Sequence, residues 1–180
     1  PQTITVTPNQ DNDTVDTSAT INIQAPGVDS RNVEVVIEDD DEQTIVSSVS
    51  AINLQEGGNG TFTVSLQYQP TTNTAVTVLS GNSNLISVQP ASLTFTQANY
   101  DIGQTVTLSA SEDANLTIDA STVILRSTGS AERTVPVNIA DNDTQRLIVA
   151  PASLSVTEED STSLSLRLEY QPANTVNVAL

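Results

Sequence analysis

The sequence predicts an all-β protein made of immunoglobulin-like antiparallel β-sandwich modules in tandem, with a period of 102 residues. Three observations support this prediction. Apolar and polar residues alternate along short segments, turn-forming residues separate those segments, and one pattern of segments recurs after 102 positions. Alternation with a period of two is typical of strands that have one buried and one solvated face. No stretch of the sequence sustains a helical periodicity.

The clearest alternation lies in two segments that occupy the same place in successive repeats. In residues 61–68, Phe62, Val64 and Leu66 alternate with polar residues, and the pattern ends at Tyr68; residues 163–170 repeat the same phase. Short strands of this kind, about seven to a hundred residues, are typical of an immunoglobulin-like sandwich. In chain order we expect strands near residues 46–54, 61–68, 74–79, 85–89, 92–95, 104–110, 121–127 and 133–140, with turns at Gly57-Gly58, Pro70, Gly81-Asn82, Pro90, Gly103 and Gly129.

The repeat defines the expected modules. Residues 1–43 align without a gap on residues 103–145, and the agreement is best at the end, where Val33, Val35, Ile37, Asp39, Asp41 and Gln43 match Val135, Val137, Ile139, Asp141, Asp143 and Gln145. The same offset carries Tyr68-Gln69-Pro70 onto Tyr170-Gln171-Pro172. We therefore expect the C-terminal half of a first module in residues 1–43, with its last three strands. A complete module follows in 44–145, and the first three strands of a third lie in 146–180.

The composition excludes several classes of chemistry. The chain has 22 acidic and 5 basic residues, the latter all Arg, and a formal net charge of −17. His and Cys are absent, so an imidazole base, a thiolate nucleophile and a Cys-ligated metal are excluded. Lys is absent as well, which excludes Schiff bases and Lys–Asn isopeptide cross-links. We expect no enzymatic activity, and the acidic surface and short apolar runs disfavour nucleic-acid binding and membrane insertion.

The acidic residues gather in loops that the strand order brings to one end of each sandwich. In the complete module, Glu56 follows the first strand, Glu112 and Asp113 follow the segment 104–110, and Asp141 and Asp143 follow the last strand. Strands that run alternately up and down place these loops at one pole. The equivalent loops carry Asp11, Asp13, Asp39, Asp40 and Asp41 in the first module and Glu158 in the third.

Oxygen ligands from several loops suit a hard cation with a flexible coordination shell, which favours Ca²⁺ over Mg²⁺ or a transition metal. Such a cation would offset the repulsion among the carboxylates and stiffen the joint to the next module. The alternative is that these loops are solvated and contribute only to solubility.

Several motifs of the complete module resemble the Calx-beta family. They are Glu56-Gly57, the acidic pair Glu112-Asp113, and Asp141-x-Asp143 at the end of the last strand. Residues 88–96 (VQPASLTFT), 99–100 and 104–107 are similar to Calx-beta-like, immunoglobulin-like tandem repeats of large bacterial surface and secreted proteins. The resemblance implies a calcium-binding spacer or adhesin module with Glu56, Glu112, Asp113, Asp141 and Asp143 as ligands. Asn142 stands where the family usually has a third Asp.

Two functions remain open. In the first, the chain is a non-catalytic spacer of a long extracellular adhesin, stalk or fibre on a bacterial cell surface, stiffened by Ca²⁺. In the second, the loops at the opposite pole, residues 69–74 and 128–132, bind a glycan or a surface protein of a host or neighbouring cell. These loops are small and polar and have no aromatic anchor, which favours the spacer.

The expected partners are neighbouring modules of the same chain or of an identical chain. A half-module alone would expose an unpaired sheet edge and half a core. Either the chain is a stretch of a longer repetitive protein, or the C-terminal strands of one copy complete the N-terminal strands of the next copy by strand addition.

Overall fold

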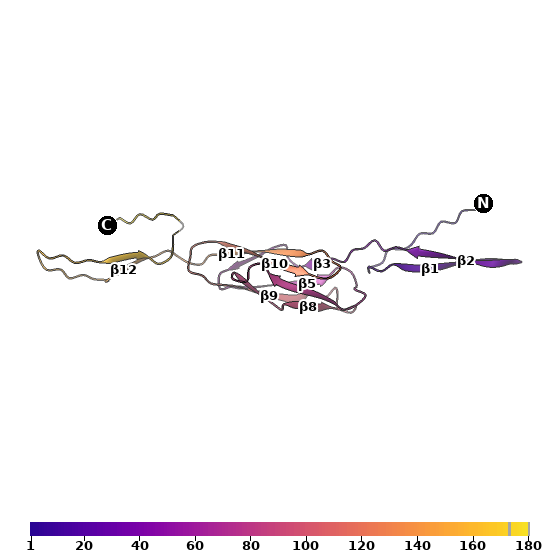
Figure 1. Ribbon diagram of the computed structural model, residues 1–180, viewed down its shortest axis with the longest axis horizontal. Coiled ribbons are helices and arrows are strands. Elements are labelled where there is room, and N and C mark those ends of the chain that lie inside the picture. The colour runs from indigo at the N-terminus through magenta and orange to yellow at the C-terminus, as the bar shows by residue number, and fades with distance from the viewer. Residues whose placement is uncertain (173, 180) are drawn as a thin grey trace.

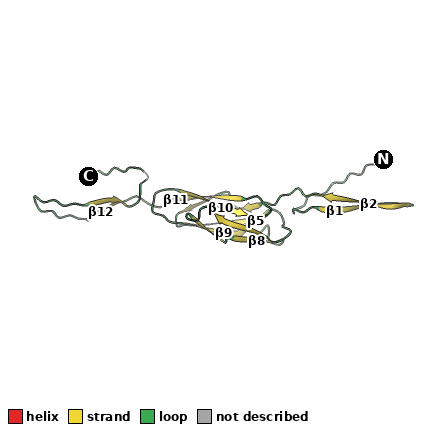
Figure 2. Ribbon diagram, viewed as in Figure 1, coloured by secondary structure: helices red, strands yellow, loops and turns green. Residues whose placement is uncertain are grey.

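The computed structural model describes residues 1–172 and 174–179, and it is drawn out along one axis with the two termini toward opposite ends (Figure 1). A β-sandwich occupies the middle, and a two-stranded hairpin extends from it on each side (Figures 1 and 2). In this part of the chain we find no helix that is long and apolar enough to span a membrane.

The central sandwich consists of two sheets. The first has the order β4-β11-β10-β6-β8, and the second has the order β3-β5-β9-β7. All neighbouring strands are antiparallel except β4 and β11, which are parallel. The all-β sandwich predicted from the sequence is therefore confirmed. The strands are β3 (Ile45–Ser47), β4 (Ile52–Gln55), β5 (Asn59–Leu66), β6 (Thr74–Ser80), β7 (Ile86–Gln89), β8 (Ser92–Phe95), β9 (Gln104–Ala110), β10 (Asp119–Arg126) and β11 (Arg133–Ala140).

The core follows the alternation in the sequence. Along β5, the side chains of Phe62, Val64 and Leu66 are buried, and the residues between them are half-buried. Along β11, Val135, Val137 and Ile139 are buried, and every residue between them is exposed. Each fully buried aliphatic or aromatic side chain contributes about 1.5–3 kcal/mol relative to an exposed one, so these two inner faces are the main source of stability.

The prediction of one strand over residues 46–54 is wrong in one respect, because the structure divides this segment between the two sheets. β3 pairs with β5, whereas β4 pairs with β11 in the other sheet. The β3 strand ends at Ser47, and Ser48 follows it. The Ser47 hydroxyl donates to the Val49 carbonyl at 2.9 Å, and the Ser48 hydroxyl accepts the Thr63 N–H at 2.9 Å. The bond from Ser47 to Val49 is local and competes with a continuous ladder, whereas the bond between Ser48 and Thr63 holds this end of the segment against β5. The other predicted strands are present, with ends shifted by at most two residues.

Each flanking segment contains one antiparallel hairpin. On the N-terminal side, β1 (Thr17–Ala25) pairs with β2 (Val28–Ile37). On the C-terminal side, β12 (Leu147–Ala150) pairs with β13 (Ser165–Leu168). At the repeat offset these hairpins correspond to β10-β11 and to β3-β5. Residues 2–8 form no strand. The last strand expected for the third module is not formed in residues 174–179, and residues 173 and 180 lie outside the described residues. The module boundaries stay a prediction.

Candidate metal site at the acidic pole

Three strands of the central sandwich end at the same pole. The pairing of parallel strands β4 and β11 continues beyond β4, where the Glu56 N–H donates to the Ala140 carbonyl at 3.0 Å. The end of β9 joins them because the Ala110 N–H donates to the Gly58 carbonyl at 2.9 Å. These contacts bring the loops that follow β4, β9 and β11 together. We call this end of the central sandwich (Glu56, residues 112–119 and 141–143) the acidic pole.

Glu56 is the centre of the acidic pole. Its side chain is only 4% exposed, and its Oε2 atom is buried without a hydrogen-bond partner. Carboxylate oxygens of Glu56, Asp141 and Asp143 lie within 4.8 Å of one another, and so do those of Glu56, Asp113 and Asp119. Glu56 therefore belongs to two groups of three carboxylates. A buried carboxylate with a free oxygen is costly unless a charge of opposite sign compensates it.

Burial and the crowding of carboxylates at the acidic pole shift the pKa of Glu56. Its burial raises the pKa of the Glu56 carboxyl above the ordinary value of 4.5, and the charges of Asp113, Asp141, Glu112 and Asp143 raise that pKa further. In the absence of a cation, the pole therefore disfavours a full set of ionised carboxylates. A bound cation would reverse this preference.

The loop geometry leaves carboxylate oxygens free for a ligand. One oxygen of Asp141, Oδ1, accepts the Asp143 N–H at 2.6 Å, and Asp113 Oδ1 accepts the Asn115 N–H at 2.9 Å. The second oxygens of Asp141 and Asp143 are buried and have no hydrogen-bond partner in the described residues. With Glu56 Oε2 they make three orphaned oxygens in one group. An all-oxygen set of this kind fits Ca²⁺.

Glu112 has a different contact. Its Oε1 atom accepts a hydrogen bond of 3.0 Å from the Asn142 side-chain amide, which also donates to the Glu56 carbonyl at 3.1 Å. The Gly57 backbone has a φ of 66°, and a Cβ atom at this position would collide with the Glu112 carboxylate. Glu112 thus packs over the Glu56-Gly57 turn.

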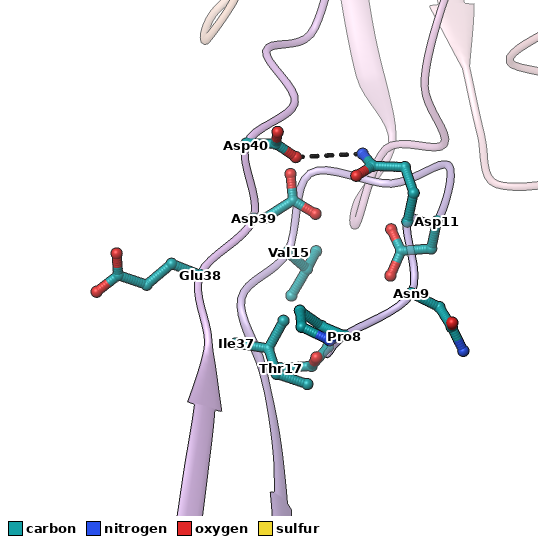
Figure 3. A pocket seen from close by; sticks show the side chains of 10 residues that line it. Pro8, Asn9, Asp11, Val15, Thr17, Ile37, Glu38, Asp39 and Asp40 are labelled. Carbon is teal, nitrogen blue, oxygen red and sulfur yellow. Dashed lines mark hydrogen bonds between the residues drawn. The ribbon is translucent and has the colours of Figure 1, made fainter. Parts of the chain in front are cut away.

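A second acidic group lies beside the N-terminal hairpin (Figure 3). Carboxylate oxygens of Asp11, Asp13 and Asp39 lie within 4.8 Å of one another. The Gln10 amide donates to Asp40 at 3.2 Å and to Asp41 at 3.0 Å. In Figure 3, Asp39 and Asp40 point toward the loop that carries Asp11.

The structure brings together most of the sequence-predicted residues. Glu56, Asp113, Asp141 and Asp143 meet at the acidic pole, with Glu112 packed over its turn, and Asp11, Asp13 and Asp39 meet in the second group, with Asp40 and Asp41 beside it. Glu158 is exposed in a turn and belongs to neither group. The role of these residues as ligands stays a prediction.

Sequence reasoning missed Asp119, the first residue of β10. Asp119 begins a strand, unlike the other acidic residues of the pole, and a strand that starts at a pole places its first side chain there. The connection from β9 to β10 begins and ends at the acidic pole, so the position of Asp119 was readable from the strand order.

The loops of the opposite pole face the preceding segment. Residues 70–75 and 127–129 line one surface depression together with Thr14 and Gln43. Part of these loops therefore lies at the joint with the N-terminal segment. Binding of a glycan or a surface protein there stays a prediction.

The chain matches no protein-family model and no curated protein sequence. Among solved structures it is similar to domains 4 and 5 of the S-layer protein SbsC, with 21% identity, a TM-score of 0.46 and coverage of 70% of this chain and 59% of that chain. It is also similar to SbsC domains 4–9, with 20% identity, a TM-score of 0.47 and coverage of 88% and 24%. It is also similar to WR4, a C. elegans member of the MSP family, with 13% identity, a TM-score of 0.42 and coverage of 53% of this chain and 97% of that chain. The chain thus spans 59% of the first of these chains and 24% of the second.

Proposed function

We propose that the chain is a non-catalytic structural repeat, a spacer of a long extracellular protein on a bacterial cell surface, stiffened by Ca²⁺ between its modules. The observation that carries the proposal is the recurrence of an acidic group 102 residues apart, each time at the junction with the following segment. Asp11, Asp39 and Asp41 correspond to Asp113, Asp141 and Asp143. A binding site used once would not require a copy at every junction.

In the central module, Glu56, Asp113, Asp119, Asp141 and Asp143 would hold the cation. It would supply positive charge where three buried carboxylate oxygens have no partner. The chain's own contribution is to hold those oxygens close together through the ends of β4, β9 and β11 and the start of β10. Because the three connections come from different parts of the chain, neutralising their charges stabilises the whole pole.

A thermal melt of the full chain in chelator, in Ca²⁺ and in Mg²⁺ tests this proposal. Ligand binding to the folded state alone adds RT ln(1 + [L]/Kd), which is about 2.7 kcal/mol at a hundredfold excess over Kd. We expect Ca²⁺ to raise the midpoint of the central module by several degrees, more than Mg²⁺ does. No rise with Ca²⁺ would contradict the proposal.

Two variants test whether the Ca²⁺-induced rise in the melting midpoint arises at the acidic pole. Glu56→Gln keeps the shape of the side chain but removes its charge, and we expect it to abolish most of the Ca²⁺ shift. The matched control is Asp101→Asn. Asp101 is exposed in the loop beside the far end of β5, where the Leu66 N–H donates to the Tyr100 carbonyl. We expect this control to retain the full shift.

A specific observation also favours association between copies. Apolar residues at the core positions of the repeat are exposed in both flanking segments. Val33 is 46% exposed, whereas its counterpart Val135 is 0% exposed. Leu154 is 44% exposed, whereas its counterpart Ile52 is 9% exposed. The occupant we propose is a second copy of this chain, whose C-terminal segment completes the N-terminal segment of its neighbour.

The central module supplies the register for this pairing. In it, Val137 is paired with Ile52 and Ile139 with Leu54. Transferred by 102 residues, Val35 of one copy would pair with Leu154 of the next, and Ile37 with Val156. The composite would lack counterparts of β7 and β8, so we expect it to be weaker than the central module. Sedimentation of the full chain should show concentration-dependent, end-to-end growth; a monomer at every concentration would contradict the pairing.

A further inference from the structure

The junctions between segments contain a hydrogen-bond pattern that the cation proposal does not use. At the first junction, the Gln43 side-chain amide donates to the Tyr68 carbonyl at 2.8 Å, and its Oε1 accepts the Tyr68 N–H at 3.2 Å. The same Oε1 accepts the Thr44 N–H at 3.0 Å. The Gln67 N–H then donates to the Thr44 carbonyl at 3.0 Å. The side chain of Gln43 thus adds one rung to the β3-β5 ladder.

The second junction repeats this pattern. The Gln145 amide donates to the Tyr170 carbonyl at 2.9 Å, and Gln145 Oε1 accepts the N–H groups of Tyr170 and Arg146, both at 3.1 Å. The Glu169 N–H donates to the Arg146 carbonyl at 2.9 Å. Four hydrogen bonds therefore recur at the repeat offset, although one junction precedes a complete sandwich and the other precedes a hairpin. A pattern that recurs in two different surroundings belongs to the junction itself.

The acidic loops of the preceding segment reach the same turn. The Gln69 N–H donates to the Asn12 carbonyl at 3.2 Å, and Asp13 and Gln69 form an isolated parallel β-bridge. The Asp41 carboxylate raises the pKa of the nearby Tyr68 hydroxyl, and the Asp143 carboxylate raises the pKa of the nearby Tyr170 hydroxyl. At the second junction, residues 115–117 line one surface depression with Gln171 and Pro172.

We propose that each acidic loop cluster and the Gln that follows it form a socket for the Tyr-Gln-Pro turn of the next module, so that modules join head to tail in one fixed relation. The socket is formed by residues 11–13, Asp41 and Gln43 for the turn at Tyr68, and by residues 113–117, Asp143 and Gln145 for the turn at Tyr170. The partner surface is therefore the head of the following module of this chain.

This geometry has a consequence for assembly. The socket lies at the tail of one segment and the turn at the head of the next, so the interface is heterologous. A heterologous contact that does not close into a ring generates a linear array. Each module is then displaced and rotated by the same amount relative to the one before it, as a spacer of regular length requires. The inference rests on the proposed spacer role. The socket shares Asp113 and Asp143 with the proposed cation site, but the bonds of Gln43 and Gln145 involve no proposed ligand and can be tested without the cation.

Distance measurements on the full chain test the socket. The chain has no Cys, so spin labels can be placed at Ser30→Cys and Thr94→Cys, which are exposed in β2 and β8. In chelator, we expect a narrow distance distribution for the otherwise unchanged chain and a broad one for Gln43→Ala. The control is Glu42→Ala, which changes the exposed neighbouring residue and should leave the distribution narrow. A broad distribution before substitution, or the same distribution in both variants, would overturn the proposal.

Amide exchange measures the same bonds one at a time and does not depend on the labels. Loss of Gln43 Oε1 should speed exchange of the Thr44 and Tyr68 amides by roughly 2- to 12-fold. Gln43→Glu keeps that acceptor but loses the donor to the Tyr68 carbonyl. We therefore expect it to keep the amides protected while the distance distribution broadens. Unchanged exchange in Gln43→Ala would contradict the socket, whereas failure of the cation site would appear only in the Ca²⁺ melt.

Discussion

The Asn142 side-chain amide donates a hydrogen bond of 3.0 Å to Glu112, and the same contact recurs in the repeat with donor and acceptor exchanged. At the corresponding positions of the first segment, the Gln10 amide donates to Asp40 at 3.2 Å. Each junction thus holds one amide and one carboxylate at this pair of positions. Two carboxylates there would repel each other within a group that is already acidic.

The exchange of roles predicts the result of a double-mutant cycle at the acidic pole. Asn142→Asp alone places a second carboxylate against Glu112 and should destabilise the central module by about 1–3 kcal/mol in chelator. Adding Glu112→Gln recreates the arrangement of Gln10 and Asp40. We expect the second change to recover much of the loss, with a coupling of about 0.5–3 kcal/mol.

Urea unfolding of the four proteins of this cycle measures the coupling. Recovery should be incomplete, because Asn142 also donates to the Glu56 carbonyl and an Asp cannot. Additive effects of the two substitutions would show that Glu112 and Asn142 act independently.

The pH dependence of stability follows from Glu56. Burial, followed by the charges of Asp113 and Asp141, raises the pKa of Glu56 in the folded protein above its ordinary value of 4.5. The folded state then binds this proton more tightly than the unfolded state does. Protonation therefore stabilises the fold below pH 4.5, and that stability is lost as the pH rises through the raised pKa.

Melts in chelator between pH 4.5 and pH 7.5 should show this loss, and Glu56→Gln should reduce it. In Ca²⁺ we expect the opposite slope, because the ligands must lose their protons before they bind the ion. The same slope in Glu56→Gln and in the unchanged chain would assign the pH dependence to other groups.

The sequence was sufficient for the alternating strands and for most of the acidic pole. Burial along β11 requires only that Val135, Val137 and Ile139 share a face, which a period of two ensures. Likewise, the meeting of Glu56, Asp113 and Asp141 requires only the order in which strands run between two poles.

Other features depend on information that local pattern does not contain. The division between β3 and β4 depends on which sheet each half joins, and the serines at 47 and 48 decide this through bonds to Val49 and Thr63. Glu158 matches Glu56 in the repeat, yet it is exposed, because in the described residues no strand lies beside it as β11 lies beside Glu56. The rung made by Gln43 is a side-chain contact with the backbone of Tyr68, and no periodicity predicts it.

Gly57 and Gly129 form a matched pair of glycines for a test of the pole. Both have positive φ, 66° and 78°. A Cβ atom at Gly129 would meet nothing within 4 Å, whereas one at Gly57 would meet the Glu112 side chain. Gly129→Ala should therefore lose only about 1–2 kcal/mol of stability through its backbone conformation. We expect Gly57→Ala to lose more and to weaken the Ca²⁺ response, as measured by melts with and without the ion. Equal effects of the two substitutions would show that Glu112 moves aside freely.

One more pair of equivalent residues in the repeat allows the core of the central module and the exposed face of the N-terminal hairpin to be tested separately. Leu125 and Ile23 occupy the same repeat position, but their exposed fractions are 0% and 45%. Leu125→Ala leaves a cavity in a packed core and should destabilise the central module by about 2–5 kcal/mol. Ile23→Ala should change the free energy of unfolding of the isolated chain by no more than about 0.5 kcal/mol.

If copies associate end to end, however, Ile23 becomes part of a composite core, and its loss should weaken self-association measured by sedimentation. Reduced association in Ile23→Ala, with the central module still folded, would place the contact on the β1-β2 hairpin, whereas unchanged association would exclude this face as the partner surface.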